Sequence, residues 1–386
     1  MRKKIIHQLS LSDIGGVQRS FALYYLYALK KSDFQHSIYS MHNLIENFSD
    51  LKNYHNIINN SLINKIKFLF FLFSKNYIVH FYNNLGSSSV YKLLNIIPSS
   101  NIIFHERGTV WNAKDEDFNI YRSNANKAKI IIANSNASKS MLIKRFGIDD
   151  NKIKVIYNGF LTKHDNFIPK NSERYSDRFN VGFLGRLDTP KGVHVLINAA
   201  KKLTEYDFFI AGKGILENEL KELAEGHKNI IFLGSTKEPL EFISKMDLMI
   251  VPSVREPLGN TIIESGYCKK PVIASNVDGI AEIIKHGIGG ILIEPDKEIT
   301  ISEISKNEVP MPKVVINPNT QELQKPKEID PLKLCESIVF MASNSNIREL
   351  YGKNLHKTVK EKFNIENYYE MLEQTYKKFD KDEYID

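Results

Sequence analysis

A regular alternation of short apolar runs with longer helical stretches is the feature that most constrains the fold of this chain. The short runs are rich in Ile, Val and Phe and end in polar or glycine-containing turns, as β-strands do. In the first half they read KKIIHQL, HSIYSM, YIVHFY, NIIFHE, KIIIANS and KIKVIYN. In the second half they read NVGFLGR, DFFIAGKG, NIIFLGS, LMIVPS, PVIASN and GGILIEP. Strands that alternate with helices are typical of parallel sheets, so we predict an α/β chain with doubly wound, Rossmann-like sheets.

The alternation breaks at residues 161 to 178, a polar stretch that indicates a linker. With 386 residues the chain is long enough for two domains, each with its own core. We place them at residues 1–165 and 166–360, followed by a helical segment at 361–386. A Pro- and Lys-containing segment at 296–331 interrupts the second pattern. We expect it to form a surface excursion or small hairpin, with a strand at VVIN and a turn at NPNT.

Composition favours a soluble globular protein, with 42% hydrophobic and 25% charged residues. The two cysteines, Cys268 and Cys335, lack the spacing of a metal site or a disulfide framework, which favours a reducing compartment. The first residues carry only a brief apolar run, and the run FLFFLF at 68–73 is far too short to cross a bilayer. We therefore expect a cytoplasmic protein without a membrane span.

The net charge of +7 is unevenly distributed. Residues 1–160 contain 21 Lys and Arg against 10 Asp and Glu, or +11, and the remaining residues contain 31 against 35, or −4. A basic half can mark a nucleic-acid or membrane partner. No helix-turn-helix, zinc-finger or RNP-type signature is present, so we exclude nucleic acid. Residues 64–77 mix Lys65, Lys67 and Lys75 with aromatic residues, which fits either an anionic membrane surface or a core element with solvated lysines.

The stretch SVREPLGNTIIESG at 253–266 carries two carboxylates on either side of an expected strand-to-helix turn. We expect backbone N–H groups to collect near Gly259, where the start of a helix with a polar cap residue would attract a phosphate. The two acids, Glu256 and Glu264, would repel that phosphate unless they accept hydrogen bonds from hydroxyls. A nucleotide sugar satisfies both demands, because its phosphates are flanked by hydroxyl-rich rings.

A second motif, GRLDTPKG at 185–192, follows the first strand of the second half. Arg186 offers a planar fork and Lys191 a compact charge, and together they suit a diphosphate that gains negative charge as it leaves. The later glycines Gly212 and Gly214 do not complete a G-x-G-x-x-G fingerprint, and no acidic residue ends the next strand. This argues against a dinucleotide-dependent dehydrogenase.

In combination these motifs resemble the retaining glycosyltransferases of family 4, whose Glu-x7-Glu element matches Glu256 and Glu264. The resemblance implies the GT-B fold, in which two Rossmann-like domains face a central cleft and the last helix packs back on the first domain. It assigns Arg186 and Lys191 to the leaving diphosphate, with Gly185 in the same loop. Glu256 is assigned to the donor sugar and Glu264 to the ribose, while the turn contributes Gly259, Asn260 and Thr261.

The resemblance extends to the first half of the chain. The loop IGGVQR with Gly15 and Gly16 is similar to the family's glycine loop, which approaches the distal phosphate, and His105 is similar to the histidine that reaches the transferred sugar. Glu106 departs from the family, which has another acid there. Two features have a plainer alternative: Trp111 fits an acceptor platform or packing, and Asp115-Glu116-Asp117 fits a metal-binding D-x-D or, as we favour, a charged loop. Ser135, Asn158 and Gly159 are read as architecture.

The implied function is transfer of a hexose-type sugar from a nucleoside diphosphate donor, with UDP-sugars favoured, to a glycan or lipid-linked acceptor in bacterial surface polysaccharide synthesis. No metal and no cofactor are expected, and the protein would be cytoplasmic or peripheral on the inner face of the plasma membrane. Two alternatives stay open. The chain could be another GT-B enzyme, such as a sugar-nucleotide epimerase or a phosphorylase, or a non-catalytic nucleotide-sugar-binding partner of a transferase complex.

Overall fold

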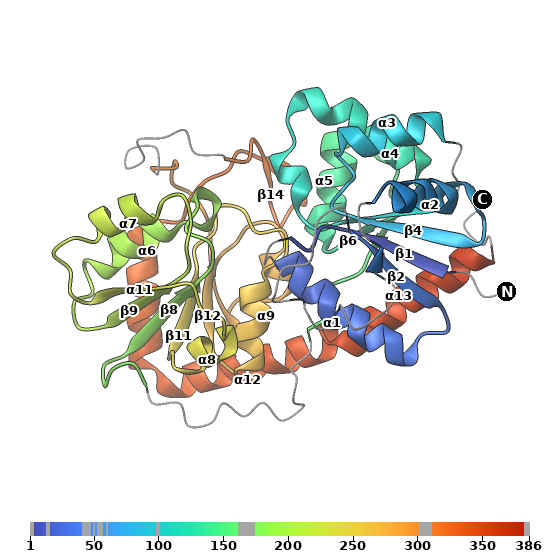
Figure 1. Cartoon of the computed structure of the whole chain (residues 1–386). Helices are drawn as coiled ribbons and strands as arrows, with labels where there is room; N and C mark the ends of the chain where they lie inside the picture. Colours follow the sequence, from blue (N-terminus) through green and yellow to red (C-terminus); the bar gives the residue numbers. More distant parts are fainter. Residues whose placement is uncertain are drawn as a thin grey trace. The chain divides into compact units, whose positions relative to one another are not determined.

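A computed structural model describes residues 4–12, 16–40, 48, 51, 57–58, 61–97, 101–160, 174–300 and 311–381. The chain separates into two compact units. The first comprises Met1–Leu161 together with Phe363–Asp386, and the second comprises Thr162–Lys362. Each unit is a parallel sheet with helices on both faces (Figure 1).

The first unit is built on a seven-stranded parallel sheet with the order β3-β2-β1-β4-β5-β6-β7. Its strands are β1 (Lys4–Gln8), β2 (Gln35–Tyr39), β3 (Ile57–Ile58), β4 (Tyr77–Tyr82), β5 (Ile102–Glu106), β6 (Ile130–Ala133) and β7 (Ile153–Val155). Each apolar run expected in the first half contains one of these strands. Only β3 was not expected, because its two residues lie in a polar context.

Helices cover both faces of this sheet (Figure 1). On one face lie α1 (Gly16–Lys31) and α13 (Ile365–Asp380), and on the other α2 (Leu62–Phe73), α3 (Ser88–Ile96), α4 (Phe118–Lys127) and α5 (Asn136–Phe146). Tyr24 of α1 and Tyr368 of α13 meet edge to face with ring centroids 5.4 Å apart. Gly159 allows α13 to approach, since a Cβ at this position would lie 2.6 Å from the Tyr368 Cβ.

The second unit has a six-stranded parallel sheet with the order β10-β9-β8-β11-β12-β13. Its strands are β8 (Asn180–Leu184), β9 (Asp207–Ala211), β10 (Ile230–Gly234), β11 (Leu248–Val251), β12 (Val272–Ser275) and β13 (Gly290–Ile293). One face is covered by α6 (Val193–Ala200), α7 (Glu217–Leu223) and α11 (Pro331–Ser343), the other by α8 (Pro239–Ser244), α9 (Asn260–Tyr267) and α12 (Ser345–Lys362) (Figure 1).

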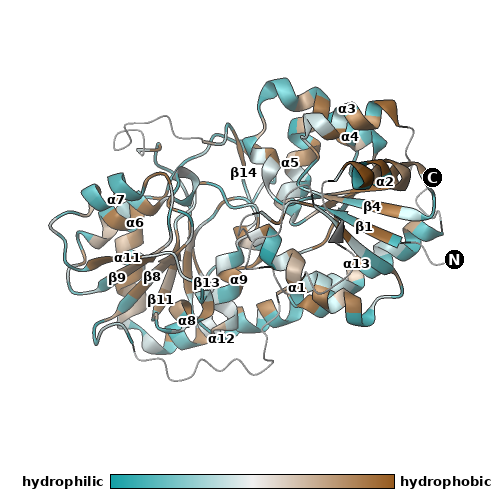
Figure 2. Cartoon of the chain, viewed as in Figure 1, coloured by the Kyte–Doolittle hydropathy of each residue, from teal (hydrophilic) through white to brown (hydrophobic). Residues whose placement is uncertain are grey.

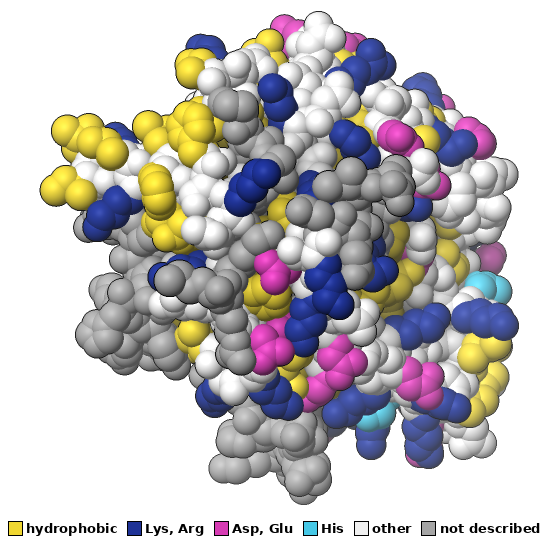
Figure 3. Space-filling model, turned by 90° about the vertical axis from the view of Figure 1, so that its right-hand side faces the viewer, with side chains coloured by type: hydrophobic (Ala, Val, Ile, Leu, Met, Phe, Trp, Pro, Cys, Tyr) yellow, Lys and Arg dark blue, Asp and Glu magenta, His cyan; other side chains and the backbone are white. Residues whose placement is uncertain are grey.

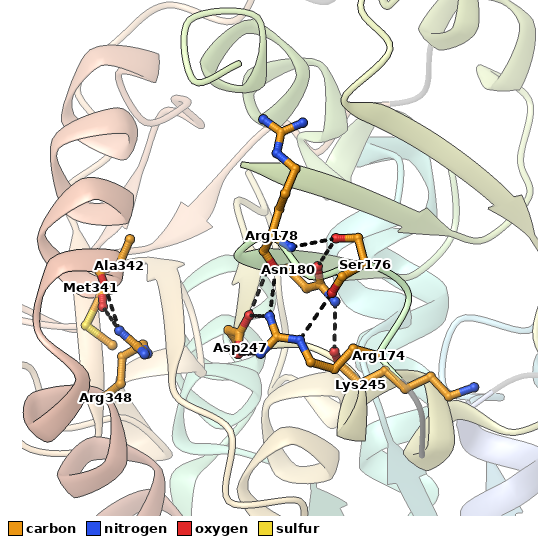
Figure 4. Close-up of polar contacts among 9 residues, drawn as sticks. All are labelled: Arg174, Ser176, Arg178, Asn180, Lys245, Asp247, Met341, Ala342 and Arg348. Carbon is orange, nitrogen blue, oxygen red and sulfur yellow. Dashed lines mark hydrogen bonds and ion pairs between the residues drawn. The ribbon is translucent and has the colours of Figure 1, made fainter. Parts of the chain in front are cut away.

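Polar contacts anchor the amino ends of the central strands of this sheet (Figure 4). Arg174 makes two hydrogen bonds to the Asp247 carboxylate, and the same carboxylate accepts the Asn180 N–H at 2.8 Å. Arg348 of α12 donates to the carbonyls of Met341 and Ala342 and so closes the α11–α12 turn. These residues lie at the amino ends of the strands, whereas ligands bind at the carboxyl ends in such folds. We therefore assign them a role in stability.

The insertion forms an antiparallel hairpin of β14 (Val315–Ile316) and β15 (Leu323–Gln324), which confirms the expected strand and turn. Residues 301–310 lie outside the described part. The expectation that the hairpin lies on the surface is wrong for β14, because Val315 and Ile316 are fully buried. The Asp278 carboxylate accepts the Ile316 N–H at 2.7 Å, and the Asp278 N–H donates to the Ile316 carbonyl.

Both cysteines are free thiols. Among the described residues, no helix combines the length and apolar character that a membrane span requires. The FLFFLF run forms the end of α2, which Figure 2 shows as one of the most hydrophobic helices of the chain.

Candidate functional site

In open parallel sheets, ligands bind at the carboxyl ends of the strands where the strand order reverses. In the second unit this point lies between β8 and β11. The loop at 185–192 follows β8 and the loop at 252–259 follows β11, so both predicted motifs meet at the switch point.

The two loops are held directly against each other. Gly192 has φ 65°, and a Cβ there would lie 2.0 Å from the Pro252 carbonyl oxygen. The Val254 N–H donates to the Pro190 carbonyl at 2.9 Å. Arg186 projects from the first loop with 68% of its side chain exposed, and its Nη2 lies 3.1 Å from the Asp188 carboxylate. The loop backbone is therefore fixed, while the Arg186 guanidinium stays accessible.

Lys191 and Glu256 form an ion pair across these loops. Lys191 Nζ donates to Glu256 Oε2 at 2.6 Å, and the Ser253 hydroxyl donates to the same oxygen at 3.3 Å. Both side chains are largely buried. The lysine that we expect to bind a phosphate and the glutamate that we expect to bind hydroxyls are thus in direct contact.

A residue that the motifs did not single out holds this point in place. Asp278 accepts the Glu256 N–H at 2.9 Å with one carboxylate oxygen and the Ile316 N–H with the other, so the insertion and the Glu256 loop share one support. Arg255 is buried, and burial lowers its pKa although Glu256 and Asp278 act in the opposite direction. Arg255 directly precedes Glu256 in the motif, but nothing in the sequence pointed to Asp278.

Helix α9 starts after Gly259, which has φ 115°. The polar cap residue that we expected is wrong, because the capping position requires a left-handed backbone that favours glycine. Gly259 has no side chain with which to cap the first turn, and the start of a helix favours an anion. Thr261 donates to the Leu184 carbonyl at 3.2 Å and ties the helix to the end of β8. Asn260, Thr261 and Glu264 are half-buried on this helix.

The glycines after β9 serve close packing. A Cβ on Gly212 would lie 1.8 Å from the Gly185 carbonyl oxygen, and one on Gly214 would lie 2.2 Å from that of Leu187. The Gly185 N–H donates to Ala211 and the Leu187 N–H to Lys213. The loop after β8 and the loop after β9 are therefore packed closely together beside the switch point.

In the first unit, His105 lies at the end of β5 and is 1% exposed. Its ring stacks on that of His80, with centroids 5.4 Å apart. Burial lowers the pKa of His105 well below its ordinary value, so the imidazole is neutral. Gly16 is the first residue of α1 and is exposed, whereas Gly15 lies outside the described residues.

The neighbouring acid has a structural role. Glu106 is fully buried and accepts hydrogen bonds from the N–H groups of Gly108, Thr109 and Val110 and from the Thr109 hydroxyl. Its carboxylate thus caps the short 3-10 helix at Thr109–Asn112. Trp111 in that helix is 1% exposed, so the acceptor-platform interpretation is wrong and packing accounts for the residue.

The remaining predicted positions have local roles. Ser135 caps α5 by accepting the Ser138 N–H at 2.9 Å, as the architectural interpretation requires. Asp115 lies 3.6 Å from Arg145, and Glu116 lies 3.6 Å from Lys114, which makes this stretch an ion-paired loop. Within the described ranges, no group of three or more His, Cys, Asp or Glu side chains is arranged to hold a metal ion.

Two family models match successive parts of the chain. Residues 77–163 match the model described as Glycosyltransferase Family 4, and residues 178–306 match that described as Glycosyl transferases group 1. Together they span more than half of the chain. The capsular polysaccharide biosynthesis glycosyltransferase CapM of Staphylococcus aureus is 24% identical over 263 residues, which cover 66% of this chain and 57% of the relative. The chain spans about half the length of the curated relatives it matches.

Solved structures share the fold over nearly the whole length. A glycosyltransferase from Rickettsia africae has a TM-score of 0.73 at 22% identity, with 98% of each chain covered. HepE of Anabaena, in complex with UDP-glucose, has a TM-score of 0.71 at 20% identity, with 97% of this chain and 99% of that chain covered. These likenesses confirm the predicted fold class. The chain therefore has the GT-B fold, with a Glycosyltransferase Family 4 domain at residues 77–163 and a Glycosyl transferases group 1 domain at residues 178–306.

Proposed function

We propose that the chain is a retaining glycosyltransferase that moves a hexose-type sugar from a nucleoside diphosphate donor, with UDP-sugars favoured, to a hydroxyl of a glycan or lipid-linked acceptor. The observation that carries the proposal is the 2.6 Å contact of Lys191 with Glu256 at the switch point of the second unit. The uncapped start of α9 follows the same loop. A phosphate bonded to a sugar ring presents the anion and the hydroxyls that this combination requires.

Each residue has a distinct role in this proposal. Arg186, Lys191 and the first turn of α9 stabilise the charge that develops on the leaving diphosphate. Glu256 accepts hydrogen bonds from the sugar, and Glu264 accepts them from the ribose. No side chain acts as a nucleophile. The acceptor attacks on the face from which the phosphate leaves, and the phosphate takes up the acceptor's proton. Because these cations supply the countercharge, we propose that transfer needs no metal.

The first unit contributes His105 to the transferred sugar and the glycine loop with Gly16 to the phosphate, a role supported by the resemblance to family 4. UDP as the nucleoside diphosphate is supported by HepE, which was crystallised with UDP-glucose. Surface polysaccharide as the product is supported by CapM, named for capsular polysaccharide biosynthesis.

We also propose that the acceptor lies at an anionic membrane surface and that α2 contacts it. Five of its large apolar side chains are more than half exposed, namely Leu62, Ile63, Ile66, Phe70 and Phe73, at 74%, 67%, 60%, 59% and 55%. Figure 3 looks onto the face that carries this helix and shows hydrophobic side chains gathered there, with basic side chains among them. Apolar residues interleaved with lysines suit the boundary between headgroups and acyl chains.

The test is a panel of nucleotide sugars with simple glycan and lipid-linked acceptors, with and without EDTA. Proton NMR of the product reads the anomeric configuration. We expect UDP release coupled to an α-linked product from an α-linked donor, unchanged by EDTA. A β-linked product would contradict retention, and loss of transfer in EDTA would contradict metal independence. Epimerised donor without a glycoside would indicate the alternative GT-B reaction, and donor binding with no turnover would indicate a non-catalytic partner.

A further inference from the structure

The first unit contains a cluster of buried polar atoms that lack hydrogen-bond partners. Its members are Ser20 Oγ, His80 Nε2, both ring nitrogens of His105, Arg107 Nε and Nη2, and the Tyr368 hydroxyl. The ring of His105 lies with its centroid 5.4 Å from that of His80 and 6.2 Å from that of Tyr368. Buried polar atoms are nearly always paired in folded proteins, so several unpaired ones at one place indicate a binding site.

Arg107 determines the charge of the ligand that fits. It follows β5 directly and is 7% exposed. Its backbone N–H donates to Asn83 Oδ1 at 2.9 Å, and its Nη1 donates to the Val17 carbonyl at 3.4 Å. The groups that act electrostatically in its favour are the tyrosines Tyr82 and Tyr368, and no carboxylate of the described residues is among them. A guanidinium keeps its proton, so Arg107 is a buried positive charge that has no ion-pair partner among the described residues.

Helix α1 adds a charge of the same sign. It starts at Gly16 and runs for 16 residues, and its first turn contains no acidic side chain. The contact of Arg107 with the Val17 carbonyl places the guanidinium at this first turn. The start of a helix offers N–H groups and a partial positive charge, which favour an anion. The first unit, Met1–Leu161 with Phe363–Asp386, contains 24 Lys and Arg against 17 Asp and Glu, and this net charge of +7 also attracts anions.

The other members of the cluster are neutral. Burial lowers the pKa of His80 and of His105 well below the ordinary value, so each ring has one donor and one acceptor. The Tyr368 hydroxyl can also donate and accept. Groups of this kind pair with hydroxyls. The ligand that fits the whole cluster therefore carries one anionic group and several hydroxyls.

We propose that this cluster binds an acidic sugar, whose carboxylate or phosphate contacts Arg107 and whose hydroxyls contact His105 and Tyr368. The proposal rests on the proposed function, because the acidic sugar is then either the sugar of the donor or the terminal residue of the acceptor. The diphosphate of the nucleotide is a different anion, which the proposed function assigns to Arg186, Lys191 and the glycine loop with Gly16. Arg107 would thus determine specificity for acidic over neutral sugars.

The experiment measures binding to the full chain by calorimetry. The probes are methyl α-D-glucuronoside, glucose 6-phosphate, methyl α-D-glucoside, inorganic phosphate and UDP. We expect at least one of the two acidic sugars to bind about tenfold or more tightly than the neutral glucoside, the scale of a hydrogen bond to a charged group. Arg107→Gln should remove this preference and leave the affinity for UDP unchanged. The control Arg19→Gln removes an exposed charge of the same helix start and should retain the preference.

UDP-glucuronate compared with UDP-glucose separates the two sources. If the chain prefers UDP-glucuronate over UDP-glucose and Arg107→Gln removes this preference, the acidic sugar belongs to the donor. If only the free acidic sugars are preferred over the glucoside, the acidic sugar belongs to the acceptor. The proposal is overturned if neither acidic sugar is preferred over the glucoside, if inorganic phosphate binds as tightly as both, or if Arg107→Gln weakens UDP as much as the sugars. Failure to bind UDP at all would instead contradict the proposed function. Arg107→Gln should not melt below the wild type, since no ion pair is lost.

Discussion

Lys191 and Glu256 neutralise each other, with the Nζ to Oε2 distance at 2.6 Å. A donor that binds here must compete with this ion pair. Its phosphate competes with Glu256 for the lysine, and its hydroxyls compete with Lys191 for the carboxylate. Arg186 differs, because most of its side chain is exposed and its ion-pair partner is Asp188 of the same loop. The two cations therefore serve the same proposed diphosphate from different structural settings.

Replacing either cation with Ala should lower turnover by about two orders of magnitude or more, the effect of lost transition-state electrostatics. Lys191→Ala should also reduce the free energy of unfolding by about 1–3 kcal/mol, because Glu256 then stays buried without its partner. Arg186→Ala should leave stability within about 0.5 kcal/mol of the wild type. Steady-state kinetics and urea unfolding measure both effects. Lys221→Ala, which removes an exposed pair with Glu217, is the control. Wild-type turnover in folded Lys191→Ala would refute the assignment.

The two acids should differ in what they bind. Glu256→Gln is expected to impair sugar transfer and leave the affinity for free UDP nearly intact, because its proposed partner is the sugar. Glu264→Gln is expected to weaken UDP as well, because its proposed partner is the ribose. Calorimetry with UDP and with a UDP-sugar gives the comparison. Equal losses of UDP affinity in both variants would contradict the separate roles.

At the scale of elements, Asp278 joins the β14–β15 hairpin to the Glu256 loop through two carboxylate oxygens. Asp278→Ala would leave two buried N–H groups unpaired, and we expect a loss of about 2–4 kcal/mol in the free energy of unfolding. Turnover should fall more than UDP affinity, because Glu256 loses its support. The control is Asp296→Ala, which removes an exposed pair with Lys333. Wild-type turnover in folded Asp278→Ala would show that the hairpin does not support the site.

Helix α2 presents exposed apolar side chains on both sides of Lys65 and Lys67 along the chain, and Ile66 between them. If it contacts a membrane, binding should have a salt-sensitive part of about 1 kcal/mol per lysine and a salt-insensitive part from buried apolar area. Co-sedimentation with anionic and neutral liposomes at low and high salt separates the two. Lys65→Glu/Lys67→Glu should remove the salt-sensitive part of the binding, and Ile66→Asp/Phe70→Asp should remove the salt-insensitive part.

The matched control for the membrane test is Leu332→Asp/Leu350→Asp, which changes two exposed leucines of the second unit. It should bind liposomes as the wild type does. Binding of the wild type that depends on neither lipid charge nor salt and survives Ile66→Asp/Phe70→Asp would exclude α2 as the contact, and a soluble acceptor would then be favoured.

The elements also show what the sequence could predict. The strands follow from apolar runs that are buried on both faces of a parallel sheet, and the loop positions follow from motifs at strand ends. The predicted start of α9 is confirmed, but its expected polar cap residue is wrong, because Gly259 at the cap has a left-handed backbone that favours glycine. The buried position of β14 was missed, since its support comes from Asp278, some forty residues earlier in the sequence. Arg107 was not predicted as a site residue, because only the structure shows that its guanidinium is buried with two nitrogens that lack a hydrogen-bond partner.

At the scale of the whole molecule, the two units differ in their buried histidines. His7, His36, His80 and His105 lie on adjacent strands of the first sheet, and His7 Nε2 is 2.8 Å from His36 Nδ1. Burial lowers the pKa of each, in His36 to about 4. The buried histidine of the second unit, His194, instead contacts the Glu328 carboxylate at 2.6 Å. Acid should therefore act mainly on the first unit.

The direction of this pH effect follows from proton binding. Below about pH 6.5 the unfolded chain protonates these histidines, whereas folded His36 stays neutral until about pH 4. The stabilisation is fully present above pH 6.5 and is lost as pH falls through this window, by about 3 kcal/mol for His36 alone. The raised pKa of buried Glu106 acts in the opposite sense.

Urea unfolding of the full chain at pH 7.5 and 5.0 should show a selective loss in the transition of the first unit. His36→Gln should flatten that dependence, whereas His227→Gln in the second unit should not. Equal losses in both units would show that the buried histidines do not govern the acid response.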